Sequence, residues 1–364
     1  MRNFKDVHRV VIKIGTNLLT KEGSFNFHYI EAVSRQISEL KERGIQVLLV
    51  SSGAIGMGAA ELNLKTRVKD IKMRQACAAI GQPLLMHQYR DAFKIYSISI
   101  AQVLLTREVF SNRITFLNLR NSGETLLSIG IIPIFNENDS VSTDEIGSAF
   151  GDNDRLSALI ASKVDADLLI ILTDIDGLYN SDPRENTDAV LISSVKELTE
   201  DIFAFAGSKG SEFSTGGMKT KLQAVGIASR AGCRTILAHG GKPDILSRLL
   251  DGEDEGTVFL GGNKLSARSR WILNSVPLGS IKIDNGALKA LRNKNSLLPA
   301  GIISIDGVFN KGDVVSINGI ANAVSNFNST ELENIIGCHS KEISSLLGKG
   351  RKDVIARPED IVFL

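Results

Sequence analysis

A glycine-rich stretch that directly precedes a helical apolar pattern has the composition of an anion-binding loop. It contains glycines, threonines and lysines in the order Thr215-Gly216-Gly217-Met218-Lys219-Thr220-Lys221. Backbone N–H groups that glycine exposes at the start of a helix bind anions, and lysines add full positive charge there. The spacing differs from the G-x-x-x-x-G-K-[ST] pattern of a P-loop. The stretch therefore predicts a phosphate-binding loop of another kind, and the alternative is an ordinary surface turn with solvated lysines.

Polar residues also follow the apolar runs in the first half of the chain. Lys13 stands near the end of one run, at residues 9–14. Three polar clusters follow other runs: Ser51-Ser52-Gly53, Asn136-Glu137-Asn138-Asp139 and Thr173-Asp174. Asp152-Asn153-Asp154 precedes a helical pattern. For Lys13 the alternative to a binding role is a strand-end lysine that extends to water, and for the aspartates it is a helix cap or an ordinary turn.

The elements that must position these residues alternate between strands and helices. The apolar patterns predict strands at residues 9–14, 45–50, 98–105, 131–135, 168–172 and 235–238. They predict helices at residues 30–40, 73–96, 116–127, 155–161 and 222–231. Alternation with continuous apolar strands indicates an α/β fold, with a mostly parallel sheet sandwiched by helices. In such sheets ligands bind beyond the C-terminal ends of the strands, where the polar clusters stand.

Beyond residue 280 the apolar runs become short and are separated by glycine and asparagine, with one clear helix at 286–291. This pattern predicts a small, mainly β domain. We therefore expect a first domain at 1–273, a linker at 274–279 and a second domain at 280–364.

Composition excludes several classes of protein. The 364 residues carry a formal net charge of +1, which argues against a chain-wide electrostatic grip on nucleic acid. Cys77, Cys233 and Cys338 are too few and too far apart for a disulfide framework, so a cytoplasmic location is expected. No zinc-ligand spacing surrounds Cys338-His339, and no resident metal is expected. No signal peptide is expected, and the sequence has no apolar run of about 20 residues that would span a membrane.

A second glycine-rich stretch resembles a dinucleotide loop only superficially. Its order is G-x-x-G-x-G rather than G-x-G-x-x-G, in Gly53-Ala54-Ile55-Gly56-Met57-Gly58. No acidic residue follows at the distance that would hold a ribose, so a Rossmann oxidoreductase is not expected. We expect these glycines to let a substrate approach backbone N–H groups.

Six motifs together resemble the amino acid kinase family, in matching order and separation. They are Val11-Ile12-Lys13-Ile14-Gly15-Thr16, Ser51-Ser52-Gly53-Ala54-Ile55, Asn136-Glu137-Asn138-Asp139, Gly151-Asp152-Asn153-Asp154-Arg155-Leu156-Ser157-Ala158, Leu172-Thr173-Asp174 and Thr215 to Lys221. The resemblance covers nearly the whole chain and is strongest to members that phosphorylate glutamate, the first step of proline synthesis. The tail resembles the PUA domain that many bacterial members carry.

The resemblance implies transfer of the γ-phosphoryl group of ATP to the side-chain carboxylate of glutamate, with Mg²⁺ carried by the nucleotide. Lys13 and Lys221 are then expected to reach the phosphoryl group. A carboxylate between two lysines would offset their repulsion, and Asp154 is the candidate, with Asp152 as the alternative. ATP is assigned to Lys13, Thr173, Asp174 and the loop Thr215, Gly216, Gly217, Met218, Lys219, Thr220 and Lys221, in which Lys219 is expected to face solvent.

For glutamate the resemblance assigns Ser52, Asp139 and Asn153. A carboxylate at Asp139 would pair with the α-ammonium group, whereas Ser52 and Asn153 would supply neutral hydrogen bonds. The resemblance also implies a homo-oligomer, either a dimer or a tetramer, inhibition by proline and a downstream reductase. Two alternatives stay open: another carboxylate or carbamate as substrate, and an RNA-binding protein that uses the tail.

Overall fold

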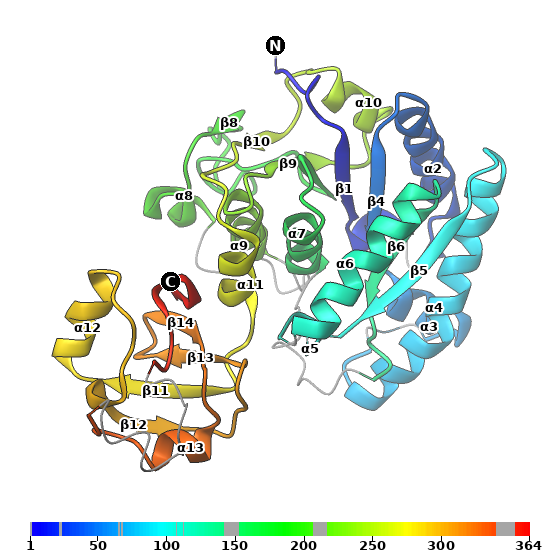
Figure 1. Cartoon of the computed structure of the whole chain (residues 1–364). Helices are drawn as coiled ribbons and strands as arrows, with labels where there is room; N and C mark the ends of the chain where they lie inside the picture. Colours follow the sequence, from blue (N-terminus) through cyan, green and yellow to red (C-terminus); the bar gives the residue numbers. More distant parts are fainter. Residues whose placement is uncertain are drawn as a thin grey trace. The chain divides into compact units, whose positions relative to one another are not determined.

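The computed structural model describes residues 2–21, 24–64, 66, 68–106, 108–111, 113–141, 153–206, 217–339 and 354–364. The chain separates into two compact units (Figure 1). One comprises Met1–Arg107 and Leu119–Lys264, and the other Glu108–Asn118 and Leu265–Leu364. The domain limits expected from the sequence, at 273 and 279, stay predictions.

An eight-stranded sheet forms the centre of the first unit, in the order β5-β6-β4-β1-β7-β9-β10-β8. Its strands are β1 (Arg9–Ile14), β4 (Gln46–Ser51), β5 (Ile100–Leu105), β6 (Ile132–Glu137), β7 (Leu168–Thr173), β8 (Ser194–Val195), β9 (Arg234–His239) and β10 (Thr257–Phe259). Strands β10 and β8 run opposite to the others, which are parallel. A short hairpin pairs β2 (Thr20–Lys21) with β3 (Ser24–Phe25). The predicted α/β class with a mostly parallel sheet is confirmed.

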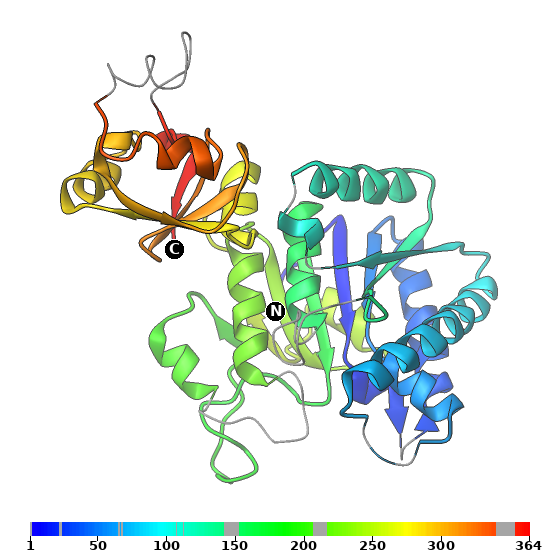
Figure 2. The same ribbon diagram turned by 90° about the horizontal axis from the view of Figure 1, so that it is seen from below.

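Helices cover both faces of this sheet (Figures 1 and 2). They are α1 (Thr16–Leu19), α2 (Phe27–Glu42), α3 (Ala54–Glu61), α4 (Ile71–Lys94), α7 (Asn153–Lys163), α8 (Glu200–Phe205), α9 (Met218–Ser229) and α10 (Ile245–Leu250). Helix α6 (Arg113–Ser128) crosses the division between the two units. Side chains cap α2, α4 and α8, because Asn26 accepts from the N–H of Tyr29, Asp70 from that of Met73 and Thr199 from that of Ile202.

The alternation of side chains along β1 separates a core face from a functional face. Val10, Ile12 and Ile14 belong to the hydrophobic core that α2, α4 and α10 complete. Because successive side chains of a strand point to opposite faces, Val11 and Lys13 face the other layer, where α7 packs against β1 and α9. Lys13 is therefore directed towards the first turns of two helices.

The stretch that begins at Gly53 forms a helix that the sequence analysis did not predict. Gly53 has φ +99°, in the left-handed region that favours glycine, and α3 begins at the next residue. A Cβ atom on Gly58 would lie 1.9 Å from the Cys77 carbonyl oxygen, and one on Gly81 1.9 Å from that of Ala54. Gly58 therefore permits close packing of α3 against α4, and the expectation that glycines here let a substrate approach stays a prediction.

The second unit contains a five-stranded sheet in the order β12-β11-β13-β14-β15. Its elements are α5 (Glu108–Ser111), α11 (Ala267–Asn274), β11 (Gly279–Ile283), α12 (Asn285–Arg292), η1 (Pro299–Gly301), β12 (Ile302–Asp306), β13 (Val314–Ile317), β14 (Ala321–Val324), α13 (Ser329–Glu333), η2 (Pro358–Asp360) and β15 (Ile361–Phe363). Among the described strands of this sheet, only β11 and β13 pair in parallel. Phe309, Phe327 and Leu332 are buried in its core. The predicted small, mainly β module is confirmed.

Within the described ranges of both units, no helix is long and apolar enough to cross a membrane.

Candidate functional site

A buried carboxylate lies between two buried lysines at the C-terminal edge of the large sheet. The Nζ atom of Lys13 lies 2.7 Å from Oδ1 of Asp154, and that of Lys221 donates to Oδ2 at 2.9 Å. The side chain of Asp154 is fully buried, and those of Lys13 and Lys221 are 2% and 7% exposed. Lys13 comes from β1, Asp154 from the first turn of α7 and Lys221 from the first turn of α9.

The charges of these three side chains sum to +1 when all are ionised. Burial of a net charge is costly, so a buried cluster with excess positive charge favours an anion nearby. The two helices contribute to the same preference, because α7 and α9 present their N-terminal turns, where the helix dipole is positive. The arrangement is therefore suited to an anionic group in transfer. Lys13 does not extend to water, which was the alternative for a strand-end lysine.

Next to this cluster, Asn153 connects the ends of β4 and β6. Its Nδ2 lies 2.8 Å from the Ser51 carbonyl oxygen, 3.0 Å from Oγ of Ser52 and 2.9 Å from Oδ1 of Asn136. The Nδ2 of Asn136 then donates to Oε1 of Gln82 at 2.7 Å. The structure thus brings two of the predicted substrate residues, Ser52 and Asn153, into one amide network.

Asp139, the third predicted substrate residue, lines a cavity of about 300 Å³ beside this network. The cavity is also lined by Ala54, Ala78, Ala79, Gln82, Pro83, Gln102, Leu104, Glu137, Asn138 and Ser140. Burial raises the pKa of the Asp139 carboxyl, and the positive charge of Arg74 offsets this in part. A desolvated carboxylate in a small cavity is a suitable partner for a cationic group of a ligand.

The predicted nucleotide residues Thr173 and Asp174 lie at the same edge, where Thr173 ends β7 and Asp174 follows it. Asp174 is exposed and accepts from Nδ2 of Asn17 at 2.7 Å and from Oγ1 of Thr173 at 3.0 Å. Burial alone would raise the pKa of Asp174, but these two hydrogen bonds and the charge of Lys221 outweigh it and lower that pKa. Asp174 is therefore ionised at neutral pH, and it can orient polar groups of a ligand.

The two lysines of the glycine-rich loop have different surroundings. Gly217 precedes α9, and Oγ1 of Thr220 donates to its carbonyl oxygen at 2.8 Å. Residues two apart on a helix lie about 200° apart around its axis, so Lys219 is exposed whereas Lys221 is buried. Met218 is half-buried at the start of the helix. Thr215, Gly216 and the alternative carboxylate Asp152 lie outside the described residues.

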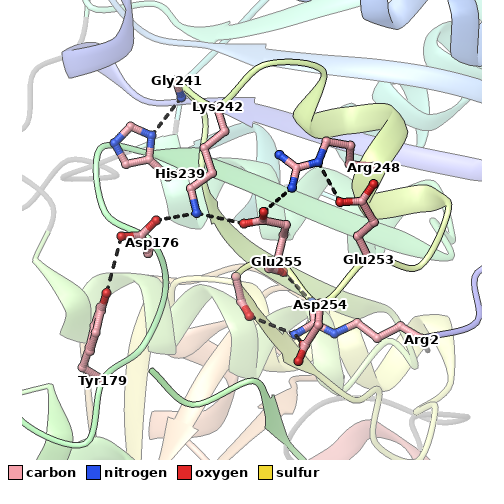
Figure 3. Close-up of polar contacts among 11 residues, drawn as sticks. Arg2, Asp176, Tyr179, His239, Gly241, Lys242, Arg248, Glu253, Asp254 and Glu255 are labelled. Carbon is pink, nitrogen blue, oxygen red and sulfur yellow. Dashed lines mark hydrogen bonds and ion pairs between the residues drawn. The ribbon is translucent and has the colours of Figure 1, made fainter. Parts of the chain in front are cut away.

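A second charged network lies at the ends of β7 and β9 (Figure 3). The Nζ atom of Lys242 lies 2.7 Å from Asp176 and 2.8 Å from Glu255. Glu255 also pairs with Arg248, which contacts Glu253 at 2.7 Å. Hydrogen bonding to Lys242 lowers the pKa of both Asp176 and Glu255, and that to Asp176 raises the pKa of Lys242.

Sequence reasoning missed three participants in these contacts. They are Gln82, Asn17 and Lys242, and none of them belongs to the polar clusters to which the sequence analysis assigned a role. Gln82 lies on a helix that follows a helix, and nothing in its local sequence distinguishes it from a solvated glutamine. Only its burial, at 8% exposure, marks it, and burial there depends on contacts with β6 that are distant in sequence.

Comparisons with known proteins agree with this geometry. The model of the amino acid kinase family matches residues 8–239, and that of the PUA domain matches residues 279–347. Glutamate 5-kinase from Methanosarcina mazei is 42% identical over 374 residues, which cover 99% of this chain and 97% of that protein. Glutamate 5-kinase from Caldanaerobacter subterraneus subsp. tengcongensis is 44% identical over 365 residues, or 98% of each chain.

The structure of carbamate kinase from Giardia lamblia bound to AMP-PNP has a similar fold. It superposes with a TM-score of 0.50 at 17% identity and covers 70% of this chain and 98% of that one. The sequence matches, which extend over both units, show the lineage directly. The chain belongs to the amino acid kinase family and carries a C-terminal PUA domain.

Proposed function

We propose that this chain transfers the γ-phosphoryl group of ATP to the side-chain carboxylate of L-glutamate and forms L-glutamate 5-phosphate. The observation that carries this proposal is the buried cluster of Lys13, Asp154 and Lys221 beside a cavity that holds Asp139. The names of relatives at 42–44% identity support the same reaction.

In this reaction an oxygen of the glutamate carboxylate forms a bond to the γ-phosphorus, and the bond from that phosphorus to the bridging oxygen breaks to release ADP. The carboxylate is ionised at neutral pH, so no general base is needed. The chemical demand is to hold two anions together and to stabilise the charge of the transferring group. Lys13 and Lys221 meet this demand, and Asp154 holds both ammonium groups towards one point.

Glutamate binding is assigned to Ser52, Asn153 and Asp139. An ionised Asp139 pairs with the α-ammonium group, which favours glutamate over an N-acylated substrate or carbamate, because neither carries that cation. ATP is assigned to Thr173, Asp174 and residues 215–221, a loop in which the exposed Lys219 faces solvent and is not assigned to the transferring group. Mg²⁺ enters with the nucleotide phosphates. We further infer a cytoplasmic enzyme that forms a homo-oligomer and is inhibited by proline; the three free cysteines support the location.

The test is ATP consumption with a panel of glutamate, N-acetylglutamate, aspartate and carbamate. Hydroxylamine traps the acyl phosphate as a hydroxamate, which distinguishes transfer to a carboxylate from simple ATP hydrolysis. We expect hydroxamate from glutamate alone. Hydroxamate from N-acetylglutamate in preference to glutamate would contradict the role of Asp139, and no hydroxamate from glutamate would remove the proposed function.

A further inference from the structure

The side chain of Gln82 is a buried amide that the proposed mechanism does not use. It lies on α4 at 8% exposure, and it lines the same cavity as Asp139. Its neighbour Pro83 lines that cavity as well. A buried amide can take part in up to four hydrogen bonds, so its partners can be accounted for one by one.

Backbone groups fix which way this amide is turned. Oδ1 of Asn136 accepts from the backbone N–H of Glu137 at 2.9 Å, so the other end of Asn136 must be its Nδ2. That Nδ2 donates to Gln82 at 2.7 Å, which places the Oε1 of Gln82 towards Asn136 and its Nε2 away from it.

Nε2 of Gln82 has no hydrogen-bond partner among the residues that the structure describes, although the atom is buried. A buried donor without an acceptor costs about 1–3 kcal/mol, and such groups mark places where a ligand completes the site. An acceptor of a ligand in the cavity would satisfy Nε2. The two groups in the cavity are then complementary to a zwitterion, because Asp139 accepts from a cation and Gln82 donates to an anion.

The position of Gln82 indicates which anion this is. Asn153 directly precedes Asp154 of the lysine cluster. It donates to Asn136, which donates in turn to Gln82. This sequence of hydrogen bonds leads from the phosphoryl-transfer end of the site to the cavity of Asp139. If the side-chain carboxylate of glutamate lies at the lysines, its α-ammonium and α-carboxylate groups lie in that cavity.

We propose that Nε2 of Gln82 donates a hydrogen bond to the α-carboxylate of glutamate and so makes the enzyme select substrates in which that group is free. The proposal rests on the proposed function and adds the recognition of the second carboxylate to it. Gln82 is thus a specificity-determining residue, whereas Asn136 and Asn153 hold it in position.

The experiment compares glutamate with L-isoglutamine, in which the α-carboxylate is an amide and the side-chain carboxylate is unchanged. Gln82→Glu keeps the oxygen that accepts from Asn136 and replaces the donor by a second acceptor. Hydrogen bonds to charged groups contribute about 1.5–3 kcal/mol, or roughly ten- to hundredfold in kcat/KM. We expect the ratio of kcat/KM for glutamate to that for isoglutamine to fall by about a hundredfold or more in this variant, with the KM of ATP unchanged.

Gln36→Glu is the matched control. Gln36 is buried on α2, but both ends of its amide are bonded, Nε2 to the Ala32 carbonyl and Oε1 to the N–H of Leu246. Any loss of stability in this variant should lower kcat/KM for both substrates together and leave the ratio of the two values unchanged. If Gln82→Glu also lowers kcat/KM for glutamate and for isoglutamine in equal proportion, Gln82 has only a structural role and the proposal is wrong.

If Gln82→Glu does not fold, a second variant tests the same proposal. Gln82→Met removes both donors at similar volume, and we expect it to reduce the preference for glutamate over isoglutamine by about tenfold. An unchanged preference would overturn the proposal. The wild-type protein distinguishes failure of this proposal from failure of the proposed function. If wild type gives no hydroxamate from glutamate, the proposed function fails. If wild type gives product and both variants keep the wild-type ratio of kcat/KM for glutamate to that for isoglutamine, only the role of Gln82 is refuted.

Discussion

Two charged clusters in the large unit have opposite arrangements of charge and differ in burial. In one, the carboxylate of Asp154 lies between Lys13 and Lys221, and all three side chains are buried. In the other, the ammonium group of Lys242 lies between Asp176 and Glu255, and the side chain of Lys242 is 34% exposed (Figure 3). Burial raises the strength of each charge interaction and the cost of an unbalanced charge, so only the first cluster creates a demand for a ligand.

The comparison is tested first by Lys221→Ala, for which the largest effect on activity is expected. Removal of one group that stabilises the transferring charge should lower kcat by about 10²- to 10³-fold and change the KM of glutamate little. Lys219→Ala is the control, because that exposed lysine stands two residues away on the same helix; its kcat should stay within about twofold. A change confined to the KM of glutamate would contradict the transfer role of Lys221.

Asp154→Asn tests the buried cluster through stability. It leaves two buried lysines without their shared carboxylate, and loss of one partner of a buried pair costs about 3–5 kcal/mol. We expect a fall of that size in the unfolding free energy, measured with denaturant. Adding Lys13→Met should restore part of it, because one uncompensated charge is removed. A variant that unfolds at the wild-type denaturant concentration would show that Asp154 does not balance the lysines.

Asp139→Asn separates binding from stability. Loss of the charge should raise the KM of glutamate about ten- to hundredfold, while unfolding free energy does not fall, because burial of an ionised carboxylate is itself unfavourable. Since burial raises the pKa of Asp139, the wild-type KM should rise as the pH falls through a value above that of an ordinary carboxyl. The variant should lack this rise. An identical pH profile of KM in both proteins would exclude Asp139 as the partner of the ammonium group.

Lys242→Met should have the smallest effect. We expect a loss of no more than about 1 kcal/mol in unfolding free energy, because water screens this half-exposed network. The pKa values of Asp176 and Glu255 are lowered in the folded protein, so their contribution is present above the ordinary carboxyl pKa and is lost as the pH falls through the folded one. The difference between variant and wild type should therefore shrink in acid. A hundredfold loss of kcat at unchanged stability would place Lys242 in the active site and contradict the distinction between the two clusters.

Patterns along the chain were sufficient to predict the edge of the sheet where the site lies. Lys13 and Thr173 lie near the C-terminal ends of β1 and β7, and Ser52 and Asp139 follow β4 and β6. Parallel strands bring their C-terminal ends together. The sequence does not distinguish Asp152 from Asp154 as the carboxylate between the lysines, because side chains two positions apart at the start of a helix can point to different partners. The structure places Asp154 at the lysines.

Contacts between distant elements account for what was missed. Five of the eight residues of α3 are glycine or alanine. The stability of this helix comes from packing against α4 through Gly58 and Gly81, which helix propensities along the sequence do not describe. Gln82 acquires its orientation from a backbone N–H more than fifty residues away, at Glu137. The role of each residue thus depends on tertiary contacts that neither spacing nor periodicity encodes.

The central claim is that Lys13 and Lys221 act as one unit on the transferring phosphoryl group, held together by Asp154. The direct measurement is kcat by hydroxamate trapping for Lys13→Met, Lys221→Met and the double variant. Residues that act as a unit give strongly non-additive losses, so the double variant should fall no more than about tenfold below the slower single variant. Losses that multiply in full would mean that the two lysines act independently, and they would contradict the account.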